Sequence, residues 1–171
     1  RSLIKEGWNA LLMDTNPWGD YDIKRENVTA ENINALMKKY EVPDEVDFLS
    51  IDIDGNDYHV WKEMTLNARV VCIEYNPNFD SLCRKVMKYD PEYIHGDTID
   101  YSASYRPMVE LGRQKGYVPI YESDYYNIIF VREDLVKPFT KEFRDSHLLI
   151  KDSPATFLPG ERRTFPLGGG L

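Results

Sequence analysis

The sequence is poor in cysteine, in basic side chains and in long apolar runs. Two cysteines, Cys72 and Cys83, are too few for a disulfide framework and indicate a reducing, cytoplasmic setting. Lys and Arg number 21 against 29 Asp and Glu, and the net charge of −8 argues against nucleic acid as the main partner, because phosphate binding needs a basic surface. No apolar run approaches the ~20 residues of a membrane-spanning helix, so no membrane span is expected.

Apolar and aromatic residues are abundant enough for one packed domain, at 42% and 13% of the chain. Apolar runs predict a strand at 8–14 and buried strands at 46–53 and 68–75. Segments that predict helices occupy 29–40, 57–64 and 104–116. Buried strands that alternate with helices indicate a parallel sheet covered on both faces, and 117–134 predicts an antiparallel hairpin at its end.

The chain is predicted to divide into an α/β domain at 1–135 and a tail at 136–171 that shows little periodicity. Within the domain, the polar segment 21–28 predicts irregular structure. The long loop 76–102 is rich in Asn, Pro, Asp and Tyr, and loops of this length inside a compact domain are usually functional.

The predicted buried strand 46–53 runs into a group of acids, which is the strongest functional signal in the sequence. Asp52, Asp54 and Asp57 follow one another closely, although like charges within ~4–6 Å disfavour joint ionisation. Glu74 and Asn76 come at the end of the next strand. Because the carboxyl ends of neighbouring parallel strands face one crevice, these side chains are expected to converge. Asp57 is predicted to cap the helix that follows it.

Four segments of the sequence resemble the FkbM-type O-methyltransferases. They are "FLSIDIDGNDYHVWKEM" (48–64), "ARVVCIEYNP" (68–77), "GDTIDYSASYRPMVELGRQKGY" (96–117) and "NIIFVRED" (127–134). The family pattern has a strand that runs into an acidic D-x-[DE]-G turn, which here is Asp52-Ile53-Asp54-Gly55. The resemblance spans residues 1–135 and leaves the tail outside it.

The resemblance implies a class I methyltransferase fold, a Rossmann-like α/β sandwich whose mostly parallel sheet ends in an antiparallel hairpin. It also implies S-adenosylmethionine as the methyl donor and a hydroxyl, often on a sugar, as the acceptor. In this fold the acid that ends the second strand holds the ribose hydroxyls of the donor. Asp14 matches that position, and Asp52 is expected to contribute to donor binding. The alternative for Asp14 is a solvated acid at a strand end.

One part of the family pattern does not occur in the 171 residues. The Gly-rich loop after the first strand approaches the donor most closely, and that strand would lie between 8–14 and 46–53. Without it, two central strands would leave backbone groups unpaired. We expect the missing strand upstream of Arg1. The chain would then be part of a larger polypeptide, and an oligomer is also compatible with the sequence. The alternative is a degenerate donor site.

Related small-molecule O-methyltransferases bind a divalent cation at this end of the sheet, and Mg²⁺ takes oxygen ligands. The resemblance therefore implies a cation site with Asp52, Glu74 and Asn76 as ligands. A cation would lower the pKa of a coordinated acceptor hydroxyl, whose proton a carboxylate could then take. Asp54 is the predicted base and His59 the second candidate. The alternatives are that Asp52 holds the turn through backbone N–H groups and that His59 is structural.

Three polar residues begin the last predicted helix, near the expected acceptor side. They are Tyr101, Ser104 and Tyr105. Stacking and hydrogen bonds from these side chains would suit a polyhydroxyl ligand. The alternative is that the tyrosines simply cover the surface.

Two other functions are compatible with the sequence. A metal-dependent glycosyltransferase would use Asp52 and Asp54 as a D-x-D pair that holds Mn²⁺ against the diphosphate of a sugar nucleotide. A catalytically degenerate methyltransferase-like domain would act as a binding module. The "GNDY" turn, the "IEYN" strand end and the terminal hairpin favour the methyltransferase over the glycosyltransferase.

Overall fold

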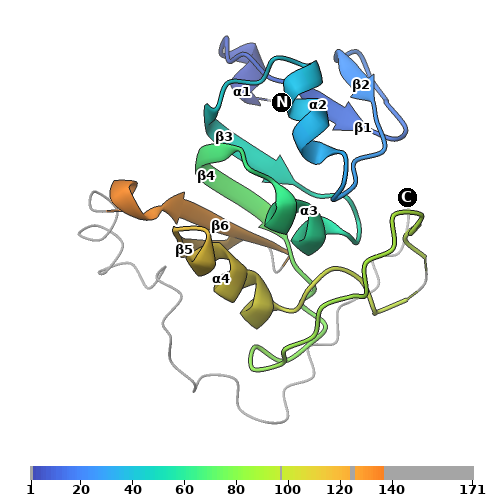
Figure 1. Ribbon diagram of the computed structural model, residues 1–171, viewed down its shortest axis with the longest axis vertical. Coiled ribbons are helices and arrows are strands. Elements are labelled where there is room, and N and C mark those ends of the chain that lie inside the picture. Colours follow the sequence, from blue (N-terminus) through green and yellow to red (C-terminus); the bar gives the residue numbers. More distant parts are fainter. Residues whose placement is uncertain (1, 97, 124–125, 137–171) are drawn as a thin grey trace, which may run out of the picture.

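The computed structural model describes residues 2–96, 98–123 and 126–136 of the chain (Figure 1). The predicted tail at 136–171 lies outside these residues, apart from its first residue. The elements follow one another as α1 (Ser2–Lys5), β1 (Leu12–Asp14), β2 (Ile23–Arg25), α2 (Ile33–Lys39), β3 (Glu45–Ile51), α3 (Asp57–Glu63), β4 (Asn67–Glu74), α4 (Tyr105–Gln114), β5 (Tyr117–Ser123), β6 (Asn127–Arg132) and the 3₁₀ turn η1 (Glu133–Leu135).

The larger sheet has the strand order β3-β4-β6-β5. β3 and β4 are parallel, with Ile51 opposite Ile73, so both strands end at the same edge of the sheet. β6 pairs antiparallel with β4 and with β5. The predicted antiparallel hairpin at the end of an α/β sheet is confirmed, and parallel pairing is confirmed for β3 and β4.

β1 and β2 form a separate two-stranded parallel sheet, with Met13 opposite Lys24. The prediction of irregular structure at 21–28 is therefore wrong for Ile23–Arg25. Two of the three residues of β2 are basic, so the strand is formed by pairing with β1 and carries no apolar pattern of its own. β1 and β3 belong to different sheets, and within the described part of the chain no strand pairs with both of them.

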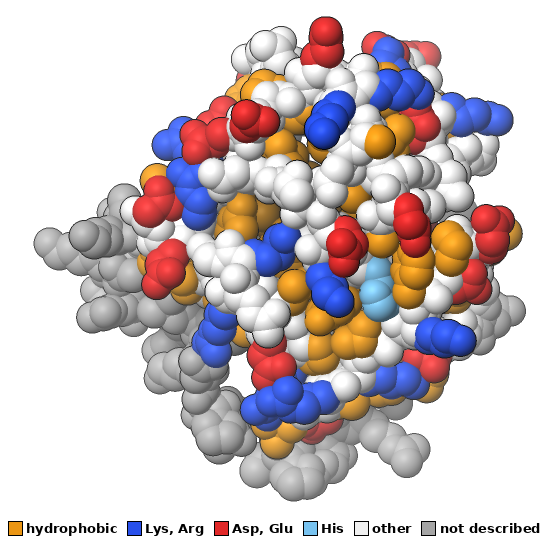
Figure 2. All heavy atoms as spheres, in the orientation of Figure 1, with side chains coloured by type: hydrophobic (Ala, Val, Ile, Leu, Met, Phe, Trp, Pro, Cys, Tyr) orange, Lys and Arg blue, Asp and Glu red, His pale blue; other side chains and the backbone are white. Residues whose placement is uncertain are grey.

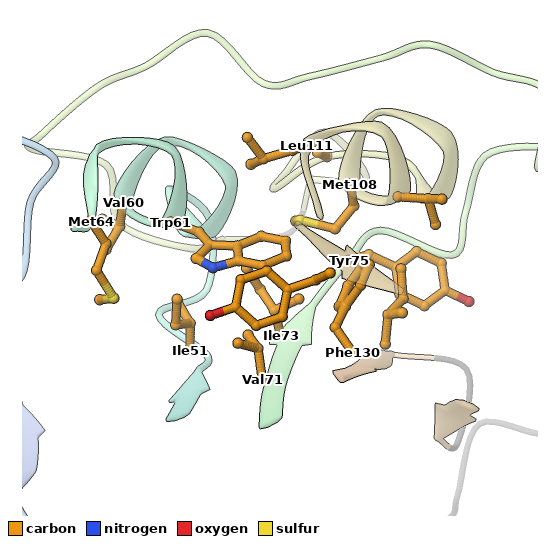
Figure 3. Close-up of a cluster of buried hydrophobic side chains, with 14 of the residues drawn as sticks. Ile51, Val60, Trp61, Met64, Val71, Ile73, Tyr75, Met108, Leu111 and Phe130 are labelled. Atoms are coloured by element: carbon orange, nitrogen blue, oxygen red, sulfur yellow. The ribbon is translucent and has the colours of Figure 1, made fainter. Parts of the chain in front are cut away.

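The helices α3 and α4 lie side by side on one face of the larger sheet, and their apolar side chains form the core (Figures 1 and 3). The Trp61 ring of α3 lies 5.0 Å from Phe130 and 5.9 Å from Tyr117, measured between ring centroids. Met108 of α4 is fully buried beside them. Phe48 of β3 is 42% exposed, so cover over both faces of the sheet is not complete within the described residues.

Two glycines shape α4. Gly116 has a φ of +83°, as expected for the residue that ends a helix, and the predicted helix end there is confirmed. An added Cβ on Gly112 would lie 2.4 Å from Cε1 of Phe130, so only glycine allows α4 to approach β6 this closely. The helix that follows the long loop is thereby fixed against the sheet.

Candidate active site

Three carboxylates meet at the carboxyl ends of the parallel strands β3 and β4. Asp52 follows the last residue of β3, Glu74 is the last residue of β4, and Asp54 lies in the turn after β3. One carboxylate oxygen from each of the three lies within 4.8 Å of the others. The convergence of Asp52 and Glu74 expected from the parallel strand ends is present in the structure.

The turn that carries Asp52 and Asp54 is held by a fourth acid, Asp57. Its carboxylate accepts the N–H of Ile53 at 2.9 Å through Oδ1 and the N–H of Gly55 at 3.0 Å through Oδ2. The predicted role of Asp57 as the cap of α3 is wrong, because Asp57 is the first residue of the helix and its side chain bonds to the preceding turn. Asp54 has a left-handed φ of +59°, which lets the chain reverse there.

Glu74 is buried without compensation. The residue is 8% exposed, and its Oε2 has no hydrogen-bond partner within the described part of the chain. Burial, followed by the charges of the neighbouring aspartates, raises the pKa of Glu74 to about 8. Any ligand that supplies a positive charge or a proton would stabilise a carboxyl in this state.

The other acids differ in how their charge is balanced. Burial raises the pKa of Asp57 to about 6, although the N–H groups of Ile53 and Gly55 oppose this shift. Burial and then the charge of Asp54 raise the pKa of Asp52. Among the described residues, no Lys or Arg forms an ion pair with any of the four acids. The cluster therefore carries a surplus of negative charge that would favour a cation.

Asn76, predicted as a cation ligand, is engaged within the loop that follows β4. Its side-chain amide donates to the carbonyl oxygens of Ile99 and Tyr101, both at 2.8 Å, and its Oδ1 accepts the N–H of Asn78 at 3.0 Å. These bonds tie the start of the loop to its end. In the structure Asp54, predicted as the base, is the third carboxylate beside Asp52 and Glu74.

His59, the second candidate base, is not part of the group formed by Asp52, Asp54 and Glu74. Its Nε2 lies 2.7 Å from the carbonyl oxygen of Met87, and its ring is 5.2 Å from that of Tyr89. The cavity beside it, of about 260 Å³, is lined by Ala30, Glu31, His59, Lys62, Glu63 and Tyr89. On the face shown in Figure 2, acidic and basic side chains are interspersed and form no continuous basic patch.

The three predicted acceptor residues have different surroundings. Tyr101 is 8% exposed, and burial together with the charges of Glu74 and other nearby groups raises its pKa to about 12. The Ser104 hydroxyl donates to the carbonyl oxygen of Cys83 at 2.8 Å and so holds the loop. The Tyr105 ring lies edge-on to Tyr75, with 5.6 Å between centroids.

Sequence reasoning missed one residue of this region, Tyr93. Its ring rests on Gly55 of the acidic turn, and its hydroxyl oxygen is buried without a hydrogen-bond partner in the described part of the chain. The only signal in the sequence was the tyrosine content of the long loop, which does not single out one position.

Asp14 ends β1 in the separate small sheet. Its Oδ1 accepts the N–H of Asn16 at 2.7 Å. Nothing in the described residues brings it into the group formed by Asp52, Asp54 and Glu74.

The described part of the chain contains no helix long and apolar enough to cross a membrane.

A family model for the methyltransferase FkbM domain matches residues 7–118, which is more than half of the chain. The matched segment includes β1, the acidic turn and the ends of β3 and β4. No curated protein and no solved structure matches the chain.

Proposed function

Because the chain belongs to the FkbM methyltransferase domain family, we propose that it transfers a methyl group from S-adenosylmethionine to a hydroxyl of a sugar or another small polyhydroxylated acceptor in the cytoplasm. The observation that carries this proposal is the position of the family match, which contains the whole acidic turn and both strand ends beside it. A methyl donor and a hydroxyl acceptor need a group that takes a proton, and the turn supplies carboxylates for this task.

The donor side of the site is proposed to use Asp14 and Asp52. Ribose hydroxyls donate well to a carboxylate at the end of a strand, and Asp14 has this position. Its Oδ1 accepts the N–H of Asn16, which fixes the carboxylate. Within the described part of the chain, Oδ2 is left for a ligand. Asp52, at the end of β3, adds negative charge that favours a cationic sulfonium group.

The acceptor side is proposed to use Asp54 as the general base. When bound, S-adenosylmethionine supplies an activated methyl group. The acceptor oxygen forms the new bond to the methyl carbon as the bond from sulfur to that carbon breaks, and the hydroxyl proton passes to the carboxylate of Asp54. Asp54 suits this role because Asp57 holds the turn from its buried side while Asp54 itself is exposed.

A divalent cation such as Mg²⁺ fits the same cluster. Asp52 and Glu74 would hold it, and the Asp54 carboxylate lies within the same 4.8 Å group. A cation is supported by the surplus negative charge and by the Oε2 of Glu74, which has no partner among the described residues. The cation would keep Glu74 ionised and polarise an acceptor hydroxyl. The Asn76 side chain would contribute only by giving up part of its bonding within the loop.

Calorimetry on the full-length polypeptide tests the proposal against the glycosyltransferase alternative. S-adenosylhomocysteine is expected to bind, and UDP- or GDP-sugars with Mn²⁺ are not. Binding of a sugar nucleotide by folded protein that ignores S-adenosylhomocysteine would reverse the assignment. Binding of neither would favour the non-enzymatic module.

A further inference from the structure

Tyr93, in the loop between β4 and α4, lies over the acidic turn. An added Cβ on Gly55 would come within 2.5 Å of Cδ1 and Cε1 of the Tyr93 ring, so the ring rests directly on the glycine. Any side chain at position 55 would displace it. The D-x-D-G turn therefore has its glycine at the point where an aromatic ring covers it.

The hydroxyl group of Tyr93 is buried and has no hydrogen-bond partner within the described part of the chain. Buried phenol groups normally have one, because an unmade hydrogen bond destabilises the fold. Burial raises the pKa of Tyr93, and the charges of Asp100 and then of Asp54 and Glu74 raise it further. The group is thus a protonated donor near carboxylates to which it does not bond.

Glu74, whose charge acts on Tyr93, is a second buried group without a partner in the described residues. Its Oε2 is a buried acceptor without a partner in the described residues, just as the Tyr93 hydroxyl is a buried donor without one. A ligand hydroxyl that reached both groups would accept a hydrogen bond from the phenol and donate one to the carboxylate. An anionic ligand group would instead meet the uncompensated charge of the cluster.

We propose that Tyr93 is an acceptor-binding residue, whose hydroxyl donates a hydrogen bond to the polyhydroxyl acceptor and whose ring closes the site over Gly55. This inference rests on the proposed methyl transfer. It adds to that reaction a residue from the middle of the long loop, outside the acidic turn and outside α4.

The position of Tyr93 is set by the residues beside the turn. Asn56, next to Gly55, donates its side-chain amide to the carbonyl oxygen of Asp90 at 2.7 Å. The N–H of Tyr93 bonds to the same carbonyl at 3.0 Å. Asn56 therefore couples the segment that carries Tyr93 to the start of α3.

Tyr89 is a matched control for the test. It belongs to the same loop, and its hydroxyl has partners inside the chain, accepting the N–H of Ala30 at 3.2 Å and donating to Glu31. Replacing either tyrosine with phenylalanine removes one hydroxyl and keeps the ring. Among the described residues, only Tyr89→Phe removes a hydrogen bond that the protein makes with itself.

The experiment compares Tyr93→Phe, Tyr89→Phe and wild type in the full-length polypeptide. Turnover is measured with radiolabelled S-adenosylmethionine and a panel of neutral methyl glycosides. Tyr93→Phe is expected to raise KM for the glycoside about three- to tenfold, the effect of one lost neutral hydrogen bond, while the Kd for S-adenosylhomocysteine changes less than about twofold. The ligand-free Tm of Tyr93→Phe is expected to equal or exceed that of wild type. Tyr89→Phe should show the reverse, with a lower Tm and an unchanged KM.

Two results would overturn the proposal. One is a Tm that falls in Tyr93→Phe as far as in Tyr89→Phe, because the hydroxyl would then serve the fold. The other is an unchanged KM for an accepted glycoside. Failure of the proposed function looks different. Folded wild type would bind no S-adenosylhomocysteine, or it would bind it and methylate no glycoside, in which case the Tm comparison still decides whether the Tyr93 hydroxyl has a partner within the fold.

Discussion

Two buried carboxylates at the same end of the sheet, Asp57 and Glu74, differ in the hydrogen bonds that their surroundings provide. Asp57 is fully buried, and both of its oxygens accept backbone N–H groups from the acidic turn. Glu74 is 8% exposed, and its Oε2 bonds to no described residue. A buried charge is costly unless it is compensated. Asp57 therefore serves the fold, whereas Glu74 keeps an oxygen available for a ligand.

The acidic cluster therefore has a supporting side, formed by Asp57, and an open side, formed by Asp52, Asp54 and Glu74. Asp57 fixes the backbone of the turn through its bonds to the N–H groups of Ile53 and Gly55. This turn positions Asp52 and Asp54. Glu74 adds the third carboxylate of the open side, from the neighbouring strand β4. Preorganised groups of this kind need no rearrangement at the moment of reaction, which is the usual requirement of a catalytic site.

The largest expected effect concerns the proposed base on the open side. Asp54→Asn should reduce turnover about 10²- to 10⁴-fold, because the acceptor hydroxyl loses the group that takes its proton. Single-turnover assays with radiolabelled donor would measure this. S-adenosylhomocysteine affinity serves as the control and should not change. A loss of turnover below tenfold would show that another group takes the proton.

The supporting side is tested by a stability comparison of Asp57→Ala with Glu74→Gln. Asp57→Ala leaves the N–H groups of Ile53 and Gly55 unpaired in a buried turn and should lower the free energy of unfolding by about 2–4 kcal/mol. Glu74→Gln removes a buried carboxylate whose Oε2 has no partner among the described residues, and should leave stability unchanged or increased at pH 8. Urea unfolding measures both. Equal losses in the two variants would remove the distinction between these carboxylates.

Asp14 extends the comparison to an acid at the end of the small sheet. Asp14→Ala should weaken S-adenosylhomocysteine binding by about 1.5–3 kcal/mol, the usual contribution of a charge-assisted hydrogen bond. Asp22→Ala is the control, because Asp22 is an exposed acid beside β2 that pairs with Lys24. If calorimetry gives the same affinity for both variants, Asp14 is a solvated strand-end acid.

The smallest effect is a pH-dependent response to Mg²⁺. The folded pKa values of Asp57 and Glu74, about 6 and about 8, lie above the ~4 of an unfolded carboxyl, so the folded state binds more protons. The stability that these groups contribute is present below pH ~4 and is lost as pH rises through their folded pKa values. Mg²⁺ at a few times its Kd should then add about 1 kcal/mol, or 2–4 °C in Tm, at pH 8.5 and almost nothing at pH 5. Glu74→Gln should abolish this response in a thermal melt. An equal shift at both pH values would place the ion elsewhere.

The strands of the site could be predicted from the sequence because their signal is local. The apolar runs at 46–53 and 68–75 became β3 and β4, and the parallel-strand rule brought Asp52 and Glu74 together. β2 could not be predicted, because its three residues carry no apolar pattern and form a strand only by pairing with β1.

The loop was beyond prediction for a different reason. Asn76 and Ser104 have side chains suited to ligands, yet they bond to backbone groups 19 to 25 residues away along the chain. Such partners depend on the path of the whole loop, which no local pattern encodes. The contact of Tyr93 with Gly55 is of the same kind.

Gly112 has a consequence for how mutational data on this protein should be interpreted. In an exposed helix, alanine is preferred over glycine by about 1 kcal/mol. At position 112 the order should reverse, because the first carbon of any side chain would overlap the Phe130 ring. In a saturation mutagenesis library, every variant at position 112 should be depleted, alanine included. Intolerance at this position would then report the distance between a helix and a strand, and should not be counted as evidence for a binding site.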